Sequence, residues 1–194
     1  MQRRAELSRR TGETEVEVVL DLDGSGVVDV KTGLGIFDHM LHALGRHSGF
    51  DLALHATGDL VVDDHHTVED CAIVLGRALD EALGDRSGIS RFGTAYAPLD
   101  ESLARAVVDL SGRPWPEVAI SFERPTVGEM STENVVHFFR SFAIEARMAL
   151  HIDLIRGDND HHKAEAAFKG LALALRDAVM ARGEGVPSTK GSLR

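Results

Sequence analysis

The chain has little of several features that mark common classes of protein. It has one cysteine, Cys71, in 194 residues, so no disulfide can form within it. Aromatic residues make up only 5%, which disfavours a surface that stacks nucleic-acid bases. No apolar run approaches the roughly 20 residues that a membrane-spanning helix needs. The net charge of −10 argues against nucleic acid or an anionic membrane as the main partner.

The N-terminal segment also lacks the apolar stretch of a secretory signal. It reads MQRRAELSRRTGE, which is polar and basic throughout. Together with the single cysteine, this predicts a cytoplasmic protein. A hydrophobic content of 43% over this length is enough for a buried core.

The apolar pattern predicts strands and helices in two similar halves. The first half, at about 10–90, is expected to have a strand at 14–24 that forms a hairpin with 27–30, a helix at 37–47, strands at 51–58 and 59–62, and a helix at 65–83. The second half, at about 91–183, is expected to have strands at 93–101, 102–112 and 113–122, a helix at 131–150, a strand at 151–157 and a helix at 158–183. A polar tail, 184–194, follows. We interpret this order as an internal duplication within one domain, 1–194.

One short motif occurs in both halves. Residues 63–70 read DDHHTVED and residues 160–166 read DHHKAEA, so His-His-x-x-Glu begins the second predicted helix of each half. The first helix of each half carries a histidine too, His39 or His137, at nearly the same distance before the motif. Isolated histidines such as His42 are more commonly ordinary surface or core residues. The repeated pattern instead indicates metal binding.

The geometry of a helix constrains how this motif can bind metal. Glu69 lies three and four residues after the two histidines, on the same face of the helix. Adjacent residues are about 100° apart around the axis, so each His-His pair is expected to divide between two ions. The expected ligands, three imidazoles and one carboxylate for each of two ions, are His39, His65, His66, Glu69, His137, His161, His162 and Glu165.

Ligands of this type suit an octahedral first-row ion with open positions. Mn²⁺ fits, and Fe²⁺, Co²⁺ and Zn²⁺ compete with it. Cys71 is expected to face away from the site and to be structural. The candidates for holding the imidazole N–H groups, or for capping the helix, are Asp38, Asp63, Asp64 and Asp70.

A second group of residues has the chemistry of an anion site. The tail sequence PSTKG, 187–191, offers hydroxyl groups, backbone N–H groups and an ammonium group to a phosphate. Arg91 and Arg113 lie at the ends of predicted strands. Taken alone, such a tail is also typical of a frayed terminus, and such arginines are commonly solvated.

Considered together, these motifs make the chain resemble the imidazoleglycerol-phosphate dehydratase family. The matching segments, in order over most of the chain, are GIFDHML, GFDL, ATGDLVVDDHHTVED, RFG, PLDE, DLSGRP, HFFRSF, HHKAEAAFK and PSTKG. The family often has two aromatic residues before the Asp-His of the first segment. Here Ile36 and Phe37 stand there, which puts no ligand in doubt.

The resemblance implies a fold and an activity. It implies an α+β fold of two pseudo-symmetric halves, each a four-stranded sheet with two helices, with the helices packed together between the sheets. It implies a metal-dependent lyase of histidine biosynthesis that dehydrates imidazole glycerol phosphate to imidazole acetol phosphate. It also implies two Mn²⁺ per subunit and a homo-oligomer of 24 subunits with active sites at subunit interfaces.

The resemblance also assigns roles to residues. Its metal ligands are the eight named above. Its substrate contacts fall on Glu13, His39, His47, His65, Glu69, Arg91, Arg113, His161, Lys169, Ser188, Thr189 and Lys190. The residues expected to take part in catalysis are Glu13, His65, Glu69, His161 and Glu165, with Glu13 as the candidate acid–base. We expect the reaction to pass through a dimetal-bound imidazolate and a diazafulvene-like intermediate.

Two other classes of protein would share part of this pattern. A metal-storage or metal-sensing protein would explain the histidines but not the phosphate-type tail. A dimetal hydrolase of phosphate esters would explain both, but such sites are usually richer in aspartate ligands.

Overall fold

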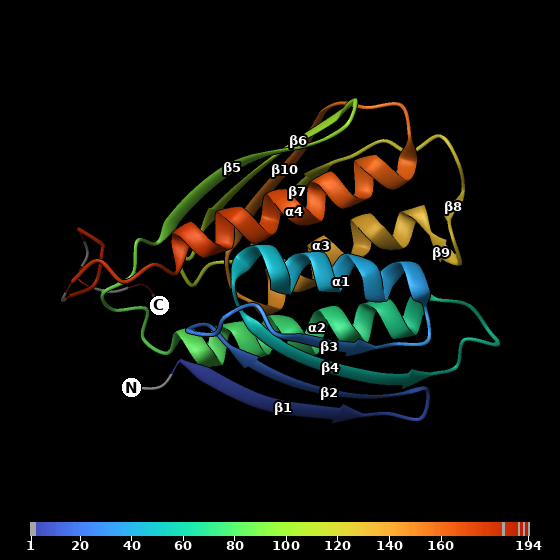
Figure 1. The fold of residues 1–194 in the computed structure, drawn as a ribbon. Coiled ribbons are helices and arrows are strands. Elements are labelled where there is room, and N and C mark those ends of the chain that lie inside the picture. Colours follow the sequence, from blue (N-terminus) through green and yellow to red (C-terminus); the bar gives the residue numbers. More distant parts are fainter. Residues whose placement is uncertain (1–2, 184, 190, 192, 194) are drawn as a thin grey trace.

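Two four-stranded sheets enclose a layer of four helices (Figure 1). The computed structural model describes residues 3–183, 185–189, 191 and 193. The first half of the chain contains β1 (Arg4–Arg10), β2 (Thr14–Asp21), β3 (Val28–Lys31), α1 (Gly35–Ser48), β4 (Asp51–Gly58) and α2 (His65–Leu83). The second half contains β5 (Phe92–Leu99), β6 (Ser102–Asp109), β7 (Trp115–Ala119), α3 (Thr132–Glu145), β10 (Ala149–Arg156) and α4 (Asp160–Ala178). A two-stranded ribbon, β8 (Thr126–Val127) and β9 (Met130–Ser131), precedes α3.

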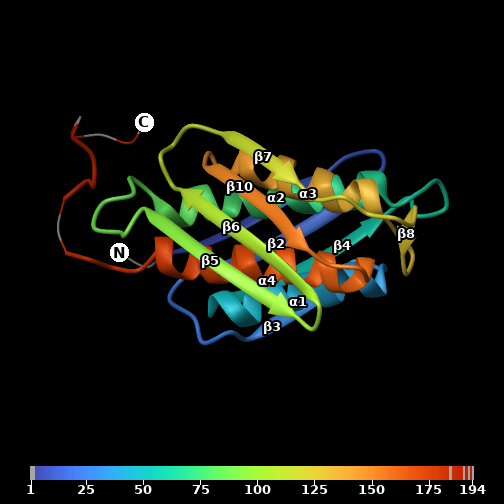
Figure 2. The same cartoon turned by 90° about the horizontal axis from the view of Figure 1, so that it is seen from above.

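The two sheets have the same topology. Their strand orders are β1-β2-β4-β3 and β5-β6-β10-β7, and in each the last strand is parallel to its neighbour while the other pairs are antiparallel. Figure 2 shows the second sheet lying across the helices. The α+β duplication, with its helices between the sheets, is therefore confirmed.

Buried apolar side chains fill the space between the sheets and the helices. Strand β2 alternates buried Val16, Val18 and Leu20 with more exposed residues, as expected for a sheet covered on one face. Five phenylalanines fill the space between the helices and are almost completely buried: Phe37, Phe138, Phe139, Phe142 and Phe168.

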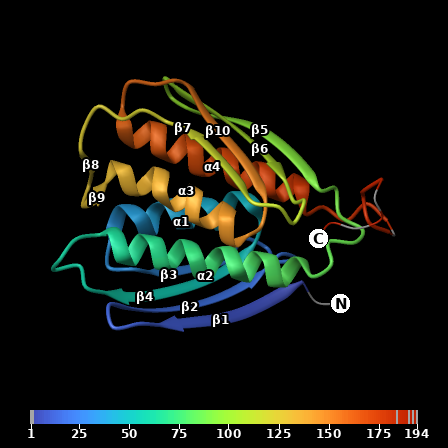
Figure 3. The same ribbon diagram turned by 180° about the vertical axis from the view of Figure 1, so that it is seen from behind.

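The helices all begin at one end of the molecule, the right-hand end in Figure 1. Helix α1 packs along α4, and α2 packs along α3 (Figures 1 and 3). Gly76 allows the second pair to approach closely, because a Cβ there would lie 2.7 Å from the carbonyl oxygen of Phe142. No helix in the described part of the chain has the length and apolar character to cross a bilayer.

Two strand predictions in the first half are wrong. Strand β2 pairs with β1, which the sequence did not reveal because only Ala5 of that polar strand is buried. The segment predicted to pair with β2, at 27–30, forms β3, which lies instead at the far edge of the sheet, parallel to β4. The predicted strand at 59–62 is a turn closed by a bond from Val62 N to Asp59 O (2.7 Å).

Helix α4 is also shorter than predicted, ending at Ala178 rather than 183. The following residues pair with the segment just before β5: Met180 O accepts from Ser90 N (2.8 Å), and Arg182 N donates to Gly88 O (2.7 Å). The backbone bonds that would extend the helix are thus made elsewhere. This pairing directs the tail toward Arg91.

Two glycines in helix interiors test the close packing. Gly76→Ala should lower the free energy of unfolding by about 1–3 kcal/mol, since the new methyl group meets the backbone of α3. Gly170→Ala in α4 is the matched control, because its Cβ would lie at ordinary contact distance, 3.5 Å from Ala106 Cβ. It should stabilise the protein by about 0.5–1 kcal/mol through helix propensity. Urea denaturation measures both, and equal effects of the two substitutions would contradict the close approach.

Candidate metal centre

The histidines of the repeated motif meet the other helix histidines where the four helices begin. His65 and His161 lie in the first turns of α2 and α4, and His39 and His137 lie one turn further along α1 and α3. Because these helices pack in pairs, two separate clusters form. Each has two imidazoles and one carboxylate whose ligand atoms all lie within 4.8 Å of one another.

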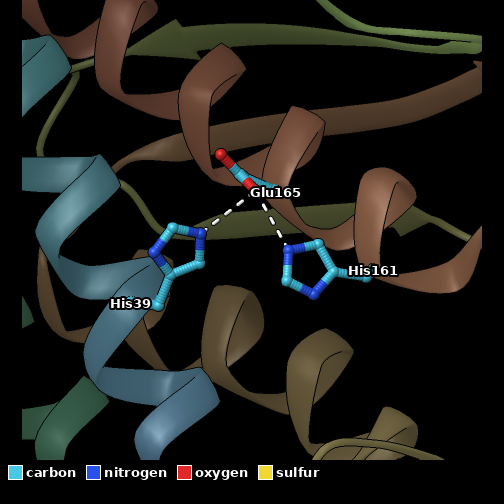
Figure 4. A group of neighbouring side chains, drawn as sticks. All are labelled: His39, His161 and Glu165. Atoms are coloured by element: carbon cyan, nitrogen blue, oxygen red, sulfur yellow. Dashed lines mark hydrogen bonds and ion pairs between the residues drawn. The ribbon is translucent and has the colours of Figure 1, made fainter.

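We name the first cluster, His39, His161 and Glu165, the Glu165 triad (Figure 4). Glu165 Oε2 lies 3.1 Å from His39 Nε2 and 3.1 Å from His161 Nε2. The two rings are stacked with centroids 5.7 Å apart. Both nitrogens therefore converge on one carboxylate oxygen, as expected of ligands that share an ion.

The second cluster, His65, His137 and Glu69, is the Glu69 triad. His137 Nε2 lies 2.9 Å from Glu69 Oε1, and the His65 and His137 rings stack at 4.8 Å. Each triad crosses the duplication: its single helix histidine comes from one half and its His-x-x-x-Glu segment from the other. Neither half can form such a cluster alone.

The second histidine of each pair points away from the triads. The rings of His65 and His66 are 81° apart, and those of His161 and His162 are 84° apart. His66 Nδ1 lies 3.0 Å from Asp59 Oδ2, and its Nε2 is 3.8 Å from Glu13. The contact with Asp59 raises the pKa of His66, and burial opposes the shift only in part. Glu13, Asp59 and His66 form a third group with atoms close enough to hold a cation.

His162 has the corresponding surroundings in the second half. Its Nδ1 lies 2.8 Å from Glu101 Oε2 in the turn between β5 and β6, as Glu13 lies in the turn between β1 and β2. This contact raises the pKa of His162. Hydrogen bonds from Asn159 N and from His162 hold the pKa of Glu101 well below its usual range.

The partners that orient these imidazoles were not foreseen. His65 Nδ1 lies 3.1 Å from the side-chain oxygen of buried Asn134, so an N–H there leaves Nε2 for the triad. Asp59 and Glu101 orient His66 and His162 in the same way. Asn134 and Glu101 lie 69 and 61 residues from the histidines that they contact, whereas Asp59 lies seven residues before His66, in the turn that precedes α2.

The aspartates that the sequence suggested for this role have other partners. Asp38 accepts from Thr32, and Asp63 accepts from the backbone N–H of His65, the first residue of α2, at 2.9 Å. Asp64 accepts from Ser131, while Asp70 holds Arg9 and Thr14. The N-cap position of α2 is Asp64, as the sequence suggested, but its side chain makes no capping hydrogen bond.

A basic pocket adjoins the Glu165 triad. It lies in the groove between α1 and α4, and its lining includes His39, His47, Glu165 and Lys169. Burial tends to raise the pKa of Glu165, but bonds from Lys169 and His39 outweigh it and lower this pKa to about 2. Burial and the positive charge of Lys169 lower the pKa of His47. The structure thus brings these four predicted site residues together.

The predicted anion residues lie at the other end of the helices. Arg91 is held by Asp109 (2.6 and 3.0 Å) and donates to Pro187 O (2.9 Å), just before Ser188. Its backbone N–H donates to Ala178 O, at the end of α4, whereas His161 is near the start of that helix. The length of the helix separates them by about 25 Å.

The remaining anion residues have less defined surroundings. Arg113 is exposed in the loop after β6, Ser188 is half-buried and Thr189 is exposed. Lys190 lies outside the described residues. Cys71 is buried in the core, where burial raises its pKa strongly. It therefore takes no part in either triad.

The chemistry of the triads fits a divalent cation. Two imidazoles with one carboxylate, leaving open positions, suit Mn²⁺, Fe²⁺, Co²⁺ or Zn²⁺. Each triad has one imidazole fewer than the predicted three. The absent ones correspond to His66 and His162, which stay outside the triads of their own chain.

Comparison with known proteins agrees with this architecture. A family model described as imidazoleglycerol-phosphate dehydratase matches residues 32–175. The dehydratase of Methanococcoides burtonii is 53% identical over 191 residues, or 98% of this chain and 100% of that relative. The Phytophthora nicotianae protein is 57% identical over 192 residues, but the chain spans only 42% of its length. A crystal structure of IGPD from Pyrococcus furiosus matches with a TM-score of 0.84 at 37% identity, covering 96% of this chain and 100% of that one. The chain therefore belongs to the imidazoleglycerol-phosphate dehydratase family, the hydro-lyases that act in histidine biosynthesis.

Proposed function

We propose that this dehydratase converts imidazole glycerol phosphate to imidazole acetol phosphate with two Mn²⁺ ions per subunit, one associated with each triad. The observation that carries the proposal is the pair of triads of one design, each combining a histidine of one half with a His-x-x-x-Glu segment of the other. The substrate ring is an imidazole, and its two nitrogens are ligands of the type that such cations would take. A single buried cysteine also supports a cytoplasmic location for the reaction.

The substrate poses a problem that the ring can solve. The C–H proton to be removed is not next to a carbonyl group and is therefore not acidic. Divalent cations, when bound, would lower the pKa of the ring N–H, as they do for coordinated water. The neighbouring hydroxyl group can then leave the substrate as water, taking a proton from an acid–base group, and the electron pair of the deprotonated ring forms the new double bond of a diazafulvene-like intermediate. The adjacent C–H then becomes acidic, and its loss gives an enol that becomes the ketone.

We propose that Glu13 moves protons in these steps. It lies in the exposed turn between β1 and β2, with its carboxylate 3.8 Å from His66 Nε2. Thr11 Oγ1 accepts from Glu13 N (3.1 Å), and Asp70 of α2 accepts from Thr14 at the end of the turn. The turn is therefore anchored while the carboxylate remains open to solvent, as an acid–base group needs.

We further propose that active sites lie between subunits of a 24-subunit assembly. The separation of about 25 Å within one chain argues for it, because one small substrate cannot contact a triad and the predicted phosphate residues of the same chain. The second histidines argue for it as well. His66 and His162 lie outside the triads of their own chain and can supply the third imidazole to a neighbour. Arg91, Arg113, Ser188, Thr189 and Lys190 would then hold the phosphate of a substrate whose ring lies at another copy's triads.

The reaction and its metal requirement can be tested together. Protein loaded with Mn²⁺ should contain about two ions per subunit and convert imidazole glycerol phosphate to the ketone without releasing inorganic phosphate. Chelation should abolish turnover, and added Mn²⁺ should restore it. Elemental analysis, ketone detection and a phosphate assay measure these quantities. Released phosphate would favour a hydrolase, and bound metal without product would favour storage or sensing.

A substitution at Glu13 tests its role. Glu13→Gln should lower kcat by about 10²- to 10⁴-fold, the usual contribution of an acid–base group, and leave Mn²⁺ and substrate binding intact. Glu15→Gln is the matched control, because Glu15 is exposed two residues further along the chain and its carboxylate forms an ion pair only with Arg10 among the described residues (3.7 Å). Near-normal kcat in Glu13→Gln would remove Glu13 from the chemistry.

Mixing two inactive variants tests the shared active site. His137→Ala removes a triad ligand, and Arg113→Ala removes a predicted phosphate contact. Each should be inactive alone, but co-assembled subunits mixed at random should regain about one quarter of the wild-type activity, because some interfaces combine two intact groups. If both groups of one site came from the same chain, no activity would return. Full activity of Arg113→Ala alone would contradict its role.

A further inference from the structure

The two triads share a design but differ in the residue one helical turn after the glutamate. Lys169 follows Glu165, and its Nζ lies 2.7 Å from Glu165 Oε1. Ile73 holds the corresponding position after Glu69. Among the described residues, Glu69 has His137 as its partner and no lysine or arginine. One triad therefore already has a cation on its carboxylate, and the other does not.

A second difference lies three residues before the single helix histidine. Asn134 stands before His137, and its side-chain oxygen lies 3.1 Å from His65 Nδ1. Ile36 stands before His39 and has no hydrogen-bonding side chain. Within the described part of the chain, His161 Nδ1 has no hydrogen-bond partner, and its Nε2 contacts Glu165. The Glu69 triad thus has an imidazole of fixed tautomer and orientation that the Glu165 triad lacks.

Both differences favour cation binding at the same triad. A divalent ion entering the Glu165 triad is repelled by the ammonium group of Lys169 or must displace it from the carboxylate. The side chain of Glu165 is 12% exposed and that of Glu69 is 35% exposed. Solvent therefore screens the ion pair between Glu165 and Lys169 less than it would screen a similar pair at Glu69. At the Glu69 triad, no lysine or arginine of the described residues pairs with the carboxylate, and Asn134 already orients His65.

We infer that the two triads bind divalent cations unequally and in sequence, the Glu69 triad first and the Glu165 triad only after Lys169 leaves Glu165. This inference rests on the proposed function, because it takes both triads as metal sites. Lys169 occupies the second site as a monovalent cation until the metal replaces it. The enzyme accordingly has a state with one ion per subunit, in which the Glu69 triad is filled.

Titration of metal-free wild-type protein with Mn²⁺ tests the inference without any turnover. Isothermal calorimetry, with the electron paramagnetic resonance signal of free Mn²⁺ as a second readout, should resolve two classes of site. Their dissociation constants should differ by about tenfold or more, as expected from a unit charge at hydrogen-bond distance from the ligand. His137→Ala should remove the tight class, and His39→Ala should remove the weak class.

Reciprocal substitutions at the two equivalent positions make the test specific. Lys169→Met should tighten the weak class by about tenfold or more and leave the tight class unchanged. Ile73→Lys should weaken the tight class, and Ile73→Met, its control without a charge, should not. Circular dichroism of each variant verifies folding. Lys169→Met and Ile73→Lys change different triads, so a folding defect in one variant leaves the test by the other intact.

The outcomes separate this inference from the proposed function. Two equal sites in the wild type, or a Lys169→Met variant with both classes unchanged, would overturn sequential loading and leave the dimetal dehydratase intact. No Mn²⁺ binding at all would overturn the proposed metal dependence and this inference with it. Two classes whose difference follows Lys169 and Ile73 would support both.

Discussion

The contact between a histidine of one half and a glutamate of the other is the interaction on which this structure depends. His39 reaches Glu165 at 3.1 Å, and His137 reaches Glu69 at 2.9 Å. These distances require that α1 pack on α4 and α3 on α2, with all four helices beginning at one end. The two sheets cover the outside of this helix layer, and the close approach at Gly76 lets the second pair meet. The fold is therefore shaped around joining its halves rather than keeping them separate.

Much of the architecture was predictable because local sequence patterns indicate it. The helix at 65–83 and the strand at 51–58 follow from apolar periodicity and from the glycines that end them. The duplication was visible because chemistry repeats at matching places. Strand β1 was not predictable, since an edge strand with only Ala5 buried has almost no hydrophobic pattern. The strands that neighbour β2 could not be predicted either, because strand order depends on contacts between distant segments.

The candidate site, like the fold, was predictable only where local spacing determines it. The spacing within His-His-x-x-Glu shows that one histidine shares a face with the glutamate, but not which helix supplies the next imidazole. The crossing between halves, and the orienting roles of Asn134, Asp59 and Glu101, depend on tertiary packing. Nearby aspartates were reasonable candidates on sequence alone, yet folding directs Asp64 and Asp70 to structural partners. Adjacency in sequence is thus a weak guide to which carboxylate faces an imidazole.

Duplication supplies two equal sites, but a substrate with unequal ends gives no reason for them to stay equal. In the proposed function the imidazole ring of the substrate would lie between both triads, whereas the rest of the substrate would extend from the ring to one side only. The basic pocket lined by His47 and Lys169 adjoins the Glu165 triad, and no pocket described here adjoins the Glu69 triad. A lysine that pairs with Glu165 would attract an anionic substrate but would compete with a metal ion for the carboxylate. An isoleucine at the matching position of the other half avoids that competition. Divergence at Lys169 and Ile73 would therefore reconcile the proposed two-fold metal arrangement with a substrate that has no two-fold symmetry.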